Sequence, residues 1–206
     1  MDTSSSRETS ASLYQEALTT FIRLLDEARA SGDREPTAMT LATADKNGRV
    51  SARIVLLKGV DADGFRFFTN HESLKGAQVA EHPQVALCFH WKPLREQVQV
   101  RIEGDAKPLS ATESDAYFAS RPRGSQIGAW ASLQSQELAD RETFERRIAE
   151  FERRFEGNPV PRPPNWGGYQ VSPDRFEFWY GALHRLHERV CYSKRGGVWK
   201  RGLLYP

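Results

Sequence analysis

Basic side chains near the C-terminus have a spacing that could bind an anion. Residues 177–189 read EFWYGALHRLHER. If this segment is extended, Arg185, His187 and Arg189 lie on one face, because successive side chains of a strand alternate between faces. Like-signed groups in one row repel one another, so the row is favourable when a flat anion lies against it. We therefore expect a phosphorylated aromatic ligand here, with Trp179 stacking beside it; the alternative is a solvated strand face.

Two further basic clusters stand earlier in the chain. Tyr117, Arg121 and Ser125 place a phenol, a guanidinium and a hydroxyl within nine positions, at an expected helix end and turn, which suits a dianion. Arg53 and Lys58 are five residues apart on an expected strand and so point to opposite faces, toward two different groups or two sites. Either cluster alone could be a surface salt-bridge network. All three together favour anion binding.

Other chemistries find less support in the sequence. His184 and His187 resemble a metal pair, but in a strand this spacing turns them to opposite faces, and no nearby Cys or carboxylate cluster completes a ligand set. No G-x-S-x-G elbow occurs, and Cys88 stands in an apolar strand pattern without an obvious base, so covalent hydrolysis lacks a nucleophile. Because G-x-G-x-x-G and P-loop motifs are also missing, side chains must hold any phosphate.

The size and composition of the chain favour one globular domain. A chain of 206 residues can bury a real core, and a net charge of +2 gives no global field that would recruit nucleic acid. No apolar run approaches the roughly 18 residues needed to span a bilayer, so we expect no membrane partner. The polar N-terminus lacks a signal-peptide core, and Cys88 and Cys191 stand in apolar patterns typical of reduced thiols. We therefore expect a cytoplasmic protein.

Short strands and turns must position the basic clusters. Apolar alternation predicts strands at residues 38–44, 50–58, 65–69, 84–91, 97–106, 166–171, 176–180, 185–193 and 198–201. Apolar stripes and capping residues predict helices from Ser10 or Ser12 to residue 30, at 73–81, from Ser110 to a break at Pro122, at 123–131 and at 140–155. Such a mixture indicates an α+β barrel rather than a parallel sheet. We expect a flexible segment at residues 1–12 and a single domain at 13–206.

Several motifs follow one another in a specific order. They are RIVLLK at 53–58, FTN at 68–70, SRPRGSQIGAW at 120–130, QS at 134–135, EFW at 177–179 and RLHER at 185–189. In these motifs, and over residues 16–206, the chain resembles the pyridoxamine/pyridoxine 5'-phosphate oxidase family. The resemblance implies an α+β fold with an antiparallel Greek-key split β-barrel flanked by helices. It also implies a homodimer with two FMN molecules in clefts at the subunit interface.

The resemblance further implies a role for each matching residue. FMN would contact Arg53, Ile54, Val55, Leu56, Leu57, Lys58, Phe68, Thr69, Lys75, Gln97, Gln134, Ser135, Trp179 and Arg189. The substrate would contact Lys58, Tyr117, Arg121 and Ser125 through its phosphate and Arg185, Leu186 and His187 near its pyridine ring. Of these, Arg185 and His187 would be the catalytic pair.

The implied reaction oxidises pyridoxine or pyridoxamine 5'-phosphate to pyridoxal 5'-phosphate. A hydride equivalent passes from the substrate C4′ carbon to flavin N5, and dioxygen then accepts the electrons as hydrogen peroxide. The amine substrate passes through an imine that water hydrolyses to release ammonia. The protein would orient the ring and neutralise phosphate charge. Two alternatives stay open, a related flavin oxidase of another aromatic metabolite such as a phenazine precursor, and a non-catalytic flavin or pyridoxal phosphate carrier.

Two positions depart from the family pattern. Leu74 stands where many members carry an arginine beside the lysine that matches Lys75, so one contact to the FMN phosphate would be missing. Members with a longer N-terminus cover the substrate with an Arg-x-x-Tyr element. Here Arg7 and Tyr14 are seven residues apart, so the resemblance does not extend to this lid, and whether the N-terminus covers the substrate stays open.

Overall fold

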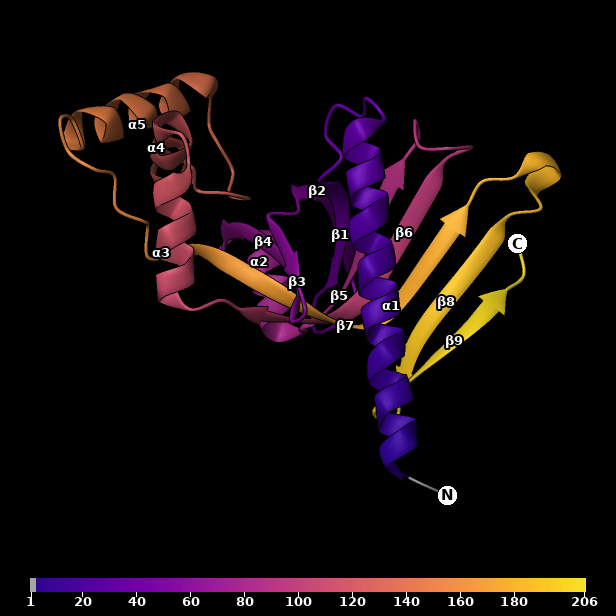
Figure 1. Cartoon of the computed structure of the whole chain (residues 1–206). Helices are drawn as coiled ribbons and strands as arrows, with labels where there is room; N and C mark the ends of the chain where they lie inside the picture. The colour runs from indigo at the N-terminus through magenta and orange to yellow at the C-terminus, as the bar shows by residue number, and fades with distance from the viewer. Residues whose placement is uncertain (1–2) are drawn as a thin grey trace.

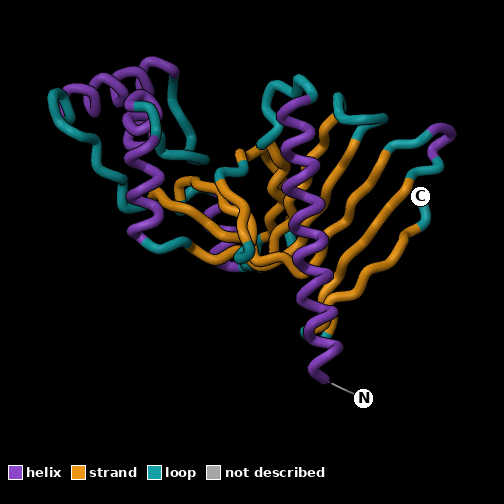
Figure 2. The backbone as a smooth tube through the Cα atoms, viewed as in Figure 1, coloured by secondary structure: helices purple, strands orange, loops and turns teal. Residues whose placement is uncertain are grey.

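The computed structural model describes residues 3 to 206, with side chains from Ser10 onward, as a curled antiparallel sheet with helices around it (Figures 1 and 2). The strands are β1 (Ala38–Ala44), β2 (Val50–Leu56), β3 (Gly59–Asp61), β4 (Gly64–Asn70), β5 (Gln84–Trp91), β6 (Val98–Pro108), β7 (Trp166–Tyr180), β8 (Glu188–Arg195) and β9 (Val198–Leu204). The helices are α1 (Thr3–Ala30), α2 (Leu74–Glu81), α3 (Ala111–Ser120), α4 (Arg123–Ala131) and α5 (Arg141–Arg154), with a 3₁₀ turn η1 (Leu183–Arg185). The expected α+β class and antiparallel sheet are confirmed.

The long strand β7 holds the two halves of the sheet together. The sheet runs in the order β2-β1-β5-β6-β7-β4-β3, and β8 pairs with both β7 and β9. We expected two strands here, at residues 166–171 and 176–180. One strand forms instead, because β6 pairs with it from Tyr169 to Tyr180. On its other side, β4 pairs only as far as Val171 and β8 pairs only from Arg175. Pro173 therefore faces no partner on that side, where its missing N–H costs no ladder bond.

Helix α1 covers one face of the sheet. Its apolar stripe includes Phe21 and Leu24, both fully buried, and the Phe21 ring meets Phe65 edge-on at 4.8 Å. Burying each such side chain contributes roughly 1.5–3 kcal/mol, so this contact anchors the helix. The tyrosine that a lid would require, Tyr14, instead packs against Trp199 and donates a hydrogen bond to the Ala62 carbonyl.

The helices α3, α4 and α5 form a separate lobe beside the sheet, drawn at the left of Figure 1. This lobe has its own apolar core, which includes Phe118, Ile127, Phe151 and Trp166. The expected capping box starts α3, because the Ser110 side chain accepts from the Glu113 N–H and Glu113 accepts in return. Trp166 opens β7, so the lobe is joined directly to the sheet.

The N-terminal helix is longer than the sequence indicated. It begins at Thr3 rather than at Ser10 or Ser12. Ser10 is buried, and its hydroxyl accepts from the Trp199 N–H at 2.8 Å instead of capping the helix. The backbone of residues 3–12 is thus helical, while the expected flexibility of residues 1–12 stays a prediction and residues 1 and 2 lie outside the described part. No described helix has the length and apolar character needed to cross a membrane.

Candidate functional site

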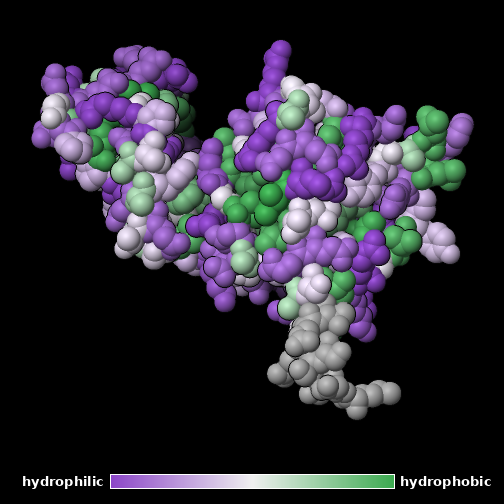
Figure 3. Space-filling model, in the orientation of Figure 1, coloured by the Kyte–Doolittle hydropathy of each residue, from purple (hydrophilic) through white to green (hydrophobic). Residues whose placement is uncertain are grey.

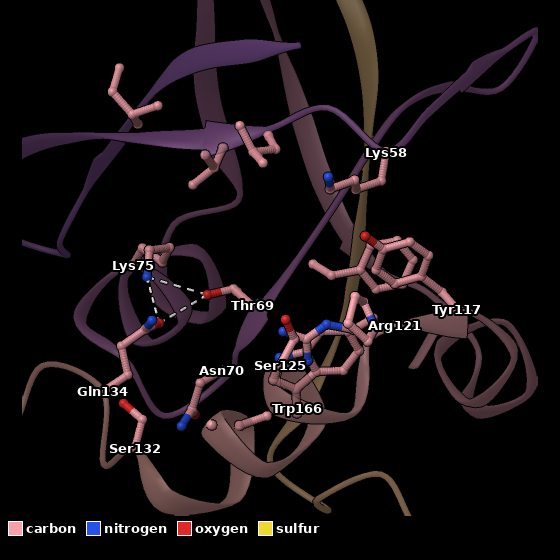
Figure 4. Close-up of a pocket in the computed structure, with 17 residues that line it drawn as sticks. Lys58, Thr69, Asn70, Lys75, Tyr117, Arg121, Ser125, Ser132, Gln134 and Trp166 are labelled. Atoms are coloured by element: carbon pink, nitrogen blue, oxygen red, sulfur yellow. Dashed lines mark hydrogen bonds between the residues drawn. The ribbon is translucent and has the colours of Figure 1, made fainter. Parts of the chain in front are cut away.

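A cavity of about 610 Å³ lies where strands β2 and β4, helix α2 and the helical lobe meet (Figure 4). Segments far apart in the sequence supply its walls. The lining residues are Ile54, Val55, Leu56, Lys58, Phe68, Thr69, Asn70, Lys75, Tyr117, Arg121, Pro122, Ser125, Gly128, Ala129, Ser132, Gln134 and Trp166. Apolar strand residues and cationic side chains therefore share one hollow, as a ligand with an aromatic ring and anionic groups requires.

One cationic group of the cavity centres on Lys75, in the first turn of α2. Its ammonium donates to Gln134 Oε1 at 2.8 Å and to Thr69 Oγ1 at 3.2 Å. Burial, together with the charge of nearby Arg53, lowers the pKa of Lys75 to about 8. Gly76 lets the helix approach closely, because a Cβ there would stand 2.1 Å from the His71 carbonyl oxygen.

Arg53 lies near Lys75 but does not line the cavity. Its guanidinium donates to Thr43 Oγ1 and Ser51 Oγ, each at 2.6 Å, and to the Leu41 carbonyl at 3.2 Å. No described carboxylate pairs with Arg53, and burial lowers the pKa of Arg53. Arg53 and Lys75 thus form a partly buried pair of like charge. Such a pair is unfavourable until an anion joins it.

A second cationic group consists of Lys58, Tyr117, Arg121 and Ser125, and Figure 4 shows it across the cavity from Lys75. Pro122 ends α3 and begins α4, which places Arg121 at the corner between the two helices. Burial lowers the pKa of Arg121 and raises the pKa of Tyr117. Arg121 stays charged, and its Nη1 is buried without a hydrogen-bond partner among the described residues. Such unused donors are typical of an anion site.

The structure brings most, but not all, of the predicted residues 53–58 to the cavity, and Arg53 is not among the lining residues. Ile54, Val55, Leu56 and the following Lys58 line the cavity as expected. The Leu57 side chain does not, since it is 4 % exposed and packs in the main core. Ile54 is apolar and yet 63 % exposed. Strand β2 is at the edge of the sheet, and no described element of the chain covers Ile54.

The predicted C-terminal row is wrong as a strand. Residues 182–187 form a loop with the 3₁₀ turn η1, and β8 begins only at Glu188. His184 and Arg185 have left-handed backbones, with φ of 57° and 62°, which a strand cannot accommodate. Only Arg189 of the three row residues is therefore in β8. His187 nevertheless lies near Trp179, with the two rings 4.4 Å apart.

We use "C-terminal cluster" for Gln97, Trp179, Arg185, Leu186, His187 and Arg189. None of them lines the cavity. Leu186 and neighbouring Leu183 are more than 70 % exposed, and Figure 3 shows apolar side chains on the surface at this turn between β7 and β8. In a single chain the cluster is thus an open surface, separate from the cavity.

Arg189 is the best-fixed member of the C-terminal cluster. Its Nε and Nη2 donate to Glu177 Oε1 at 2.9 and 2.7 Å, and its Nη1 donates to the Tyr205 carbonyl at 2.9 Å. Glu177 is 2 % exposed and also pairs with Arg101 and Arg175 at 3.3 and 3.5 Å. A buried carboxylate that is shared by several arginines fixes their direction.

Backbone strain falls on several predicted residues. The non-glycine residues with left-handed φ among residues 3–206 are Arg95, Gln97, Ser135, His184 and Arg185. Gln97, Ser135 and Arg185 had been expected to contact cofactor or substrate. Ser135 itself is not a lining residue, but Gln134 beside it is. Such strain persists where the surroundings impose it, often at functional sites.

The lining residues that the sequence did not predict are Asn70, Pro122, Gly128, Ala129, Ser132 and Trp166. The sequence analysis expected a stacking tryptophan at Trp179 and not at Trp166. A signal was present, because two glycines follow Trp166 at a point where the chain must pass close to other side chains. Nothing in the sequence pattern marks Ser132.

Comparison with known proteins gives the family. Residues 25–155 match the family model described as pyridoxamine 5'-phosphate oxidase, which is more than half of the chain. The chain belongs to this family. Residues 166–206 match a second model, described as the pyridoxine 5'-phosphate oxidase C-terminal dimerisation region. The chain is accordingly an oxidoreductase of a flavoprotein family, and its C-terminal cluster lies within the family's dimerisation region.

Individual relatives of the oxidase family cover nearly the whole chain. The chain is 58 % identical over 196 residues to a pyridoxine/pyridoxamine 5'-phosphate oxidase of Xanthomonas campestris, covering 94 % of this chain and 98 % of that protein. It is 53 % identical to one of Myxococcus xanthus, covering 90 % and 89 %.

Solved structures are similar to the whole fold. PhzG from Burkholderia lata, in complex with tetrahydrophenazine-1-carboxylic acid, has a TM-score of 0.86 at 35 % identity and covers 91 % of each chain. A pyridoxamine 5'-phosphate oxidase-related FMN-binding protein of Nostoc punctiforme has a TM-score of 0.72 at 18 % identity, covering 91 % of this chain and 96 % of that one. The second likeness supports the split-barrel fold alone.

The cavity residues fit the flavin that the family implies. Lys75, Thr69 and Gln134 form a polar pocket beside Arg53, with more positive than negative charge. Ile54, Val55 and Leu56 contribute to the apolar part of the cavity lining. A planar ring with one anionic tail would match this donor set.

Proposed function

We propose that this protein is an FMN-dependent oxidase that converts pyridoxamine or pyridoxine 5'-phosphate to pyridoxal 5'-phosphate. Dioxygen would be the electron acceptor and hydrogen peroxide a product, with ammonia released from the amine. The observation that carries the proposal is the pair of cationic groups on opposite sides of one cavity. Two separate anion sites suit a cofactor phosphate and a substrate phosphate whose rings lie side by side.

The residues near Lys75 would hold the cofactor. Lys75, Thr69 and Gln134 would bind the FMN phosphate, with Arg53 adding charge, and Ile54 to Leu56 would contact the ring. FMN, when bound, supplies the two-electron acceptor that the protein itself lacks. Lys58, Tyr117, Arg121 and Ser125 would bind the substrate phosphate and so fix the substrate's direction.

The C-terminal cluster would complete the site in a homodimer. We propose that the cluster of one subunit meets the cavity of the other, with Arg185 and His187 at the substrate ring and Trp179 and Arg189 at the flavin. Two observations support this arrangement. The cluster lies in the region that matches the dimerisation model, and the exposed Ile54 leaves the cavity rim uncovered in one chain.

Oxygen uptake by the purified protein tests the proposal. The protein saturated with FMN should be yellow, consume oxygen with pyridoxine or pyridoxamine 5'-phosphate, and form hydrogen peroxide and pyridoxal 5'-phosphate. Absence of turnover with both substrates would contradict it. A non-catalytic carrier would instead bind ligand without bleaching the flavin absorbance when mixed with substrate under anaerobic conditions. The cytoplasmic location and the lack of a nucleic-acid partner stay predictions.

An oxidase of a phenazine precursor is the second candidate, because PhzG is similar over most of the chain. The two candidates differ in what the second cationic group would bind. Lys58, Tyr117, Arg121 and Ser125 are arranged for a phosphate rather than for an unphosphorylated tricyclic ring. Faster turnover of tetrahydrophenazine-1-carboxylic acid than of pyridoxine 5'-phosphate would favour the second candidate.

A further inference from the structure

Arg121 is held by an aromatic face rather than by a carboxylate. Its guanidinium carbon lies 4.6 Å from the centroid of the Trp166 ring and 5.5 Å from that of Phe118. No described side chain forms a salt bridge with Arg121, and its Nη1 is buried without a hydrogen-bond partner. Most partly buried arginines of this chain differ, as Arg189 does by pairing with Glu177.

The kind of partner decides how much charge remains for a ligand. A carboxylate fixes a guanidinium but neutralises it and occupies the donors that a phosphate needs. An aromatic face attracts the cation through the ring quadrupole and leaves the N–H edge free. The Trp166 ring thus fixes the orientation of the Arg121 guanidinium, while the charge and the N–H donors of Arg121 remain free to bind a phosphate.

Trp166 is itself firmly placed. Its carbonyl accepts from Arg162 Nη1 at 2.6 Å, and its ring is stacked with Phe68 at 5.5 Å and nearly parallel to Tyr117 at 6.2 Å. Gly168 makes room for this stack, because a Cβ there would stand 2.7 Å from the Phe68 ring. The Trp-Gly-Gly run at the start of β7 therefore builds an aromatic wall of the cavity.

We propose that Trp166 is a positioning residue that holds Arg121 for the substrate phosphate and thereby sets the preference for a phosphorylated over an unphosphorylated ligand. This inference deepens the proposed function and rests on it. Trp166 would act through Arg121 and would touch neither reacting atom. Its loss should weaken phosphate recognition and leave FMN binding unchanged.

Ligand binding by three variants tests this role. Trp166→Leu removes the aromatic face and should raise the Kd for pyridoxal 5'-phosphate about tenfold, while the Kd for unphosphorylated pyridoxal stays the same. Trp166→Phe keeps a ring and should stay within about threefold of the wild type. Trp130→Leu removes another tryptophan of the same lobe, one that packs on Phe151 and does not line the cavity, and should bind as the wild type does.

Binding is followed by absorbance titration of the FMN-loaded protein, with FMN affinity and thermal unfolding measured for each variant. Equal Kd values for pyridoxal 5'-phosphate in Trp166→Leu and the wild type would overturn the inference alone. Failure of the wild type to bind pyridoxal 5'-phosphate would overturn the proposed function instead. If Trp166→Leu does not fold, Arg121→Lys serves in its place. Lysine keeps the charge but not the planar stacking, so the selective tenfold loss should recur, and its absence would refute the role.

Discussion

The cavity and the C-terminal cluster are built in opposite ways. Lys75 is 9 % exposed and makes three hydrogen bonds to neighbouring side chains, and Arg121 is stacked on Trp166. Arg185, Leu186 and His187 of the C-terminal cluster lie on a solvent-exposed turn, where Leu183 and Leu186 have no apolar cover. One region is organised within the chain, whereas the other is presented outward.

The difference indicates where each region obtains its stability. Left-handed backbones at His184 and Arg185 cost of order 1–3 kcal/mol each and persist only when surrounding groups impose them. The exposed turn has few such groups of its own. Packing against a second subunit would supply them, whereas the cavity needs no such help.

A mixing experiment is the strongest way to break this comparison. Arg121→Ala alters the cavity and Arg185→Ala alters the cluster, and each homodimer should lose about 10²–10³-fold in kcat/KM, because a charged partner of the substrate is removed. If a site takes its cavity from one subunit and its cluster from the other, a mixed dimer has one intact site. Coexpression of the two variants should then restore about a quarter of the wild-type activity. Random pairing makes half of the dimers mixed, and each mixed dimer has one intact site of two.

The control for the mixing experiment combines Arg121→Ala with Lys58→Ala, both in the cavity. Every site of that mixture carries a defect, so activity should stay at the level of the single variants. No recovery in the Arg121→Ala and Arg185→Ala mixture would mean that cavity and cluster act within one chain.

The same contrast explains what the sequence could predict. Capping residues, turn glycines and apolar alternation are local, and they located most elements, including the capping box at Ser110 and strand β1. The C-terminal strand was predicted too early because the alternation of Arg185, His187 and Arg189 resembles a strand, while the left-handed turn depends on packing around it. Trp166 was missed for a similar reason. Its meeting with Arg121 depends on how the lobe packs, which no spacing reveals.

A second prediction separates cofactor binding from catalysis. Arg53→Ala should weaken FMN binding about 10- to 100-fold, since a charged hydrogen bond contributes about 1.5–3 kcal/mol. His187→Ala should lower turnover and leave FMN bound, because His187 lies in the open cluster. Fluorescence titration with FMN and steady-state assays measure the two effects. Arg66→Ala removes a half-buried arginine that pairs with Asp61 outside the cavity, and serves as the control. If His187→Ala lost FMN and Arg53→Ala kept it, the assignment of Arg53 to cofactor binding and of His187 to catalysis would be wrong.

The pH dependence of FMN binding gives a third prediction. The pKa of Lys75 is lowered to about 8 in the free protein, and an FMN phosphate beside it would raise that pKa again. Below this pH Lys75 is charged in both states, so affinity is constant. Above it the free protein must take up a proton to bind FMN, so the Kd should rise by up to about tenfold per pH unit.

Lys75→Met tests the source of this pH effect. That variant should bind FMN more weakly at pH 7. Between pH 7.5 and about 9.5 its Kd for FMN should rise only as far as other titrating groups cause it to rise. A wild-type Kd that stays flat through this range would mean that Lys75 does not contact the FMN phosphate. The turnover-deficient His187→Ala variant should keep the wild-type slope, since His187 is proposed to lie at the substrate ring and not at the FMN phosphate.

The smallest expected effect comes from adding a charge at Leu74. This residue precedes Lys75 in the first turn of α2, is 53 % exposed, and occupies the position where the family pattern has an arginine. Leu74→Arg should lower the Kd for FMN by a few-fold, to about tenfold at most, because an exposed cation is screened by solvent and salt. The gain should shrink between low salt and about 0.5 M salt, whereas a gain from new apolar packing would not. Leu74→Met is the uncharged control. If Leu74→Arg left the affinity for FMN unchanged at low salt, the first turn of α2 would not face the cofactor phosphate. Lys75 alone would then not show that a single chain forms the phosphate site.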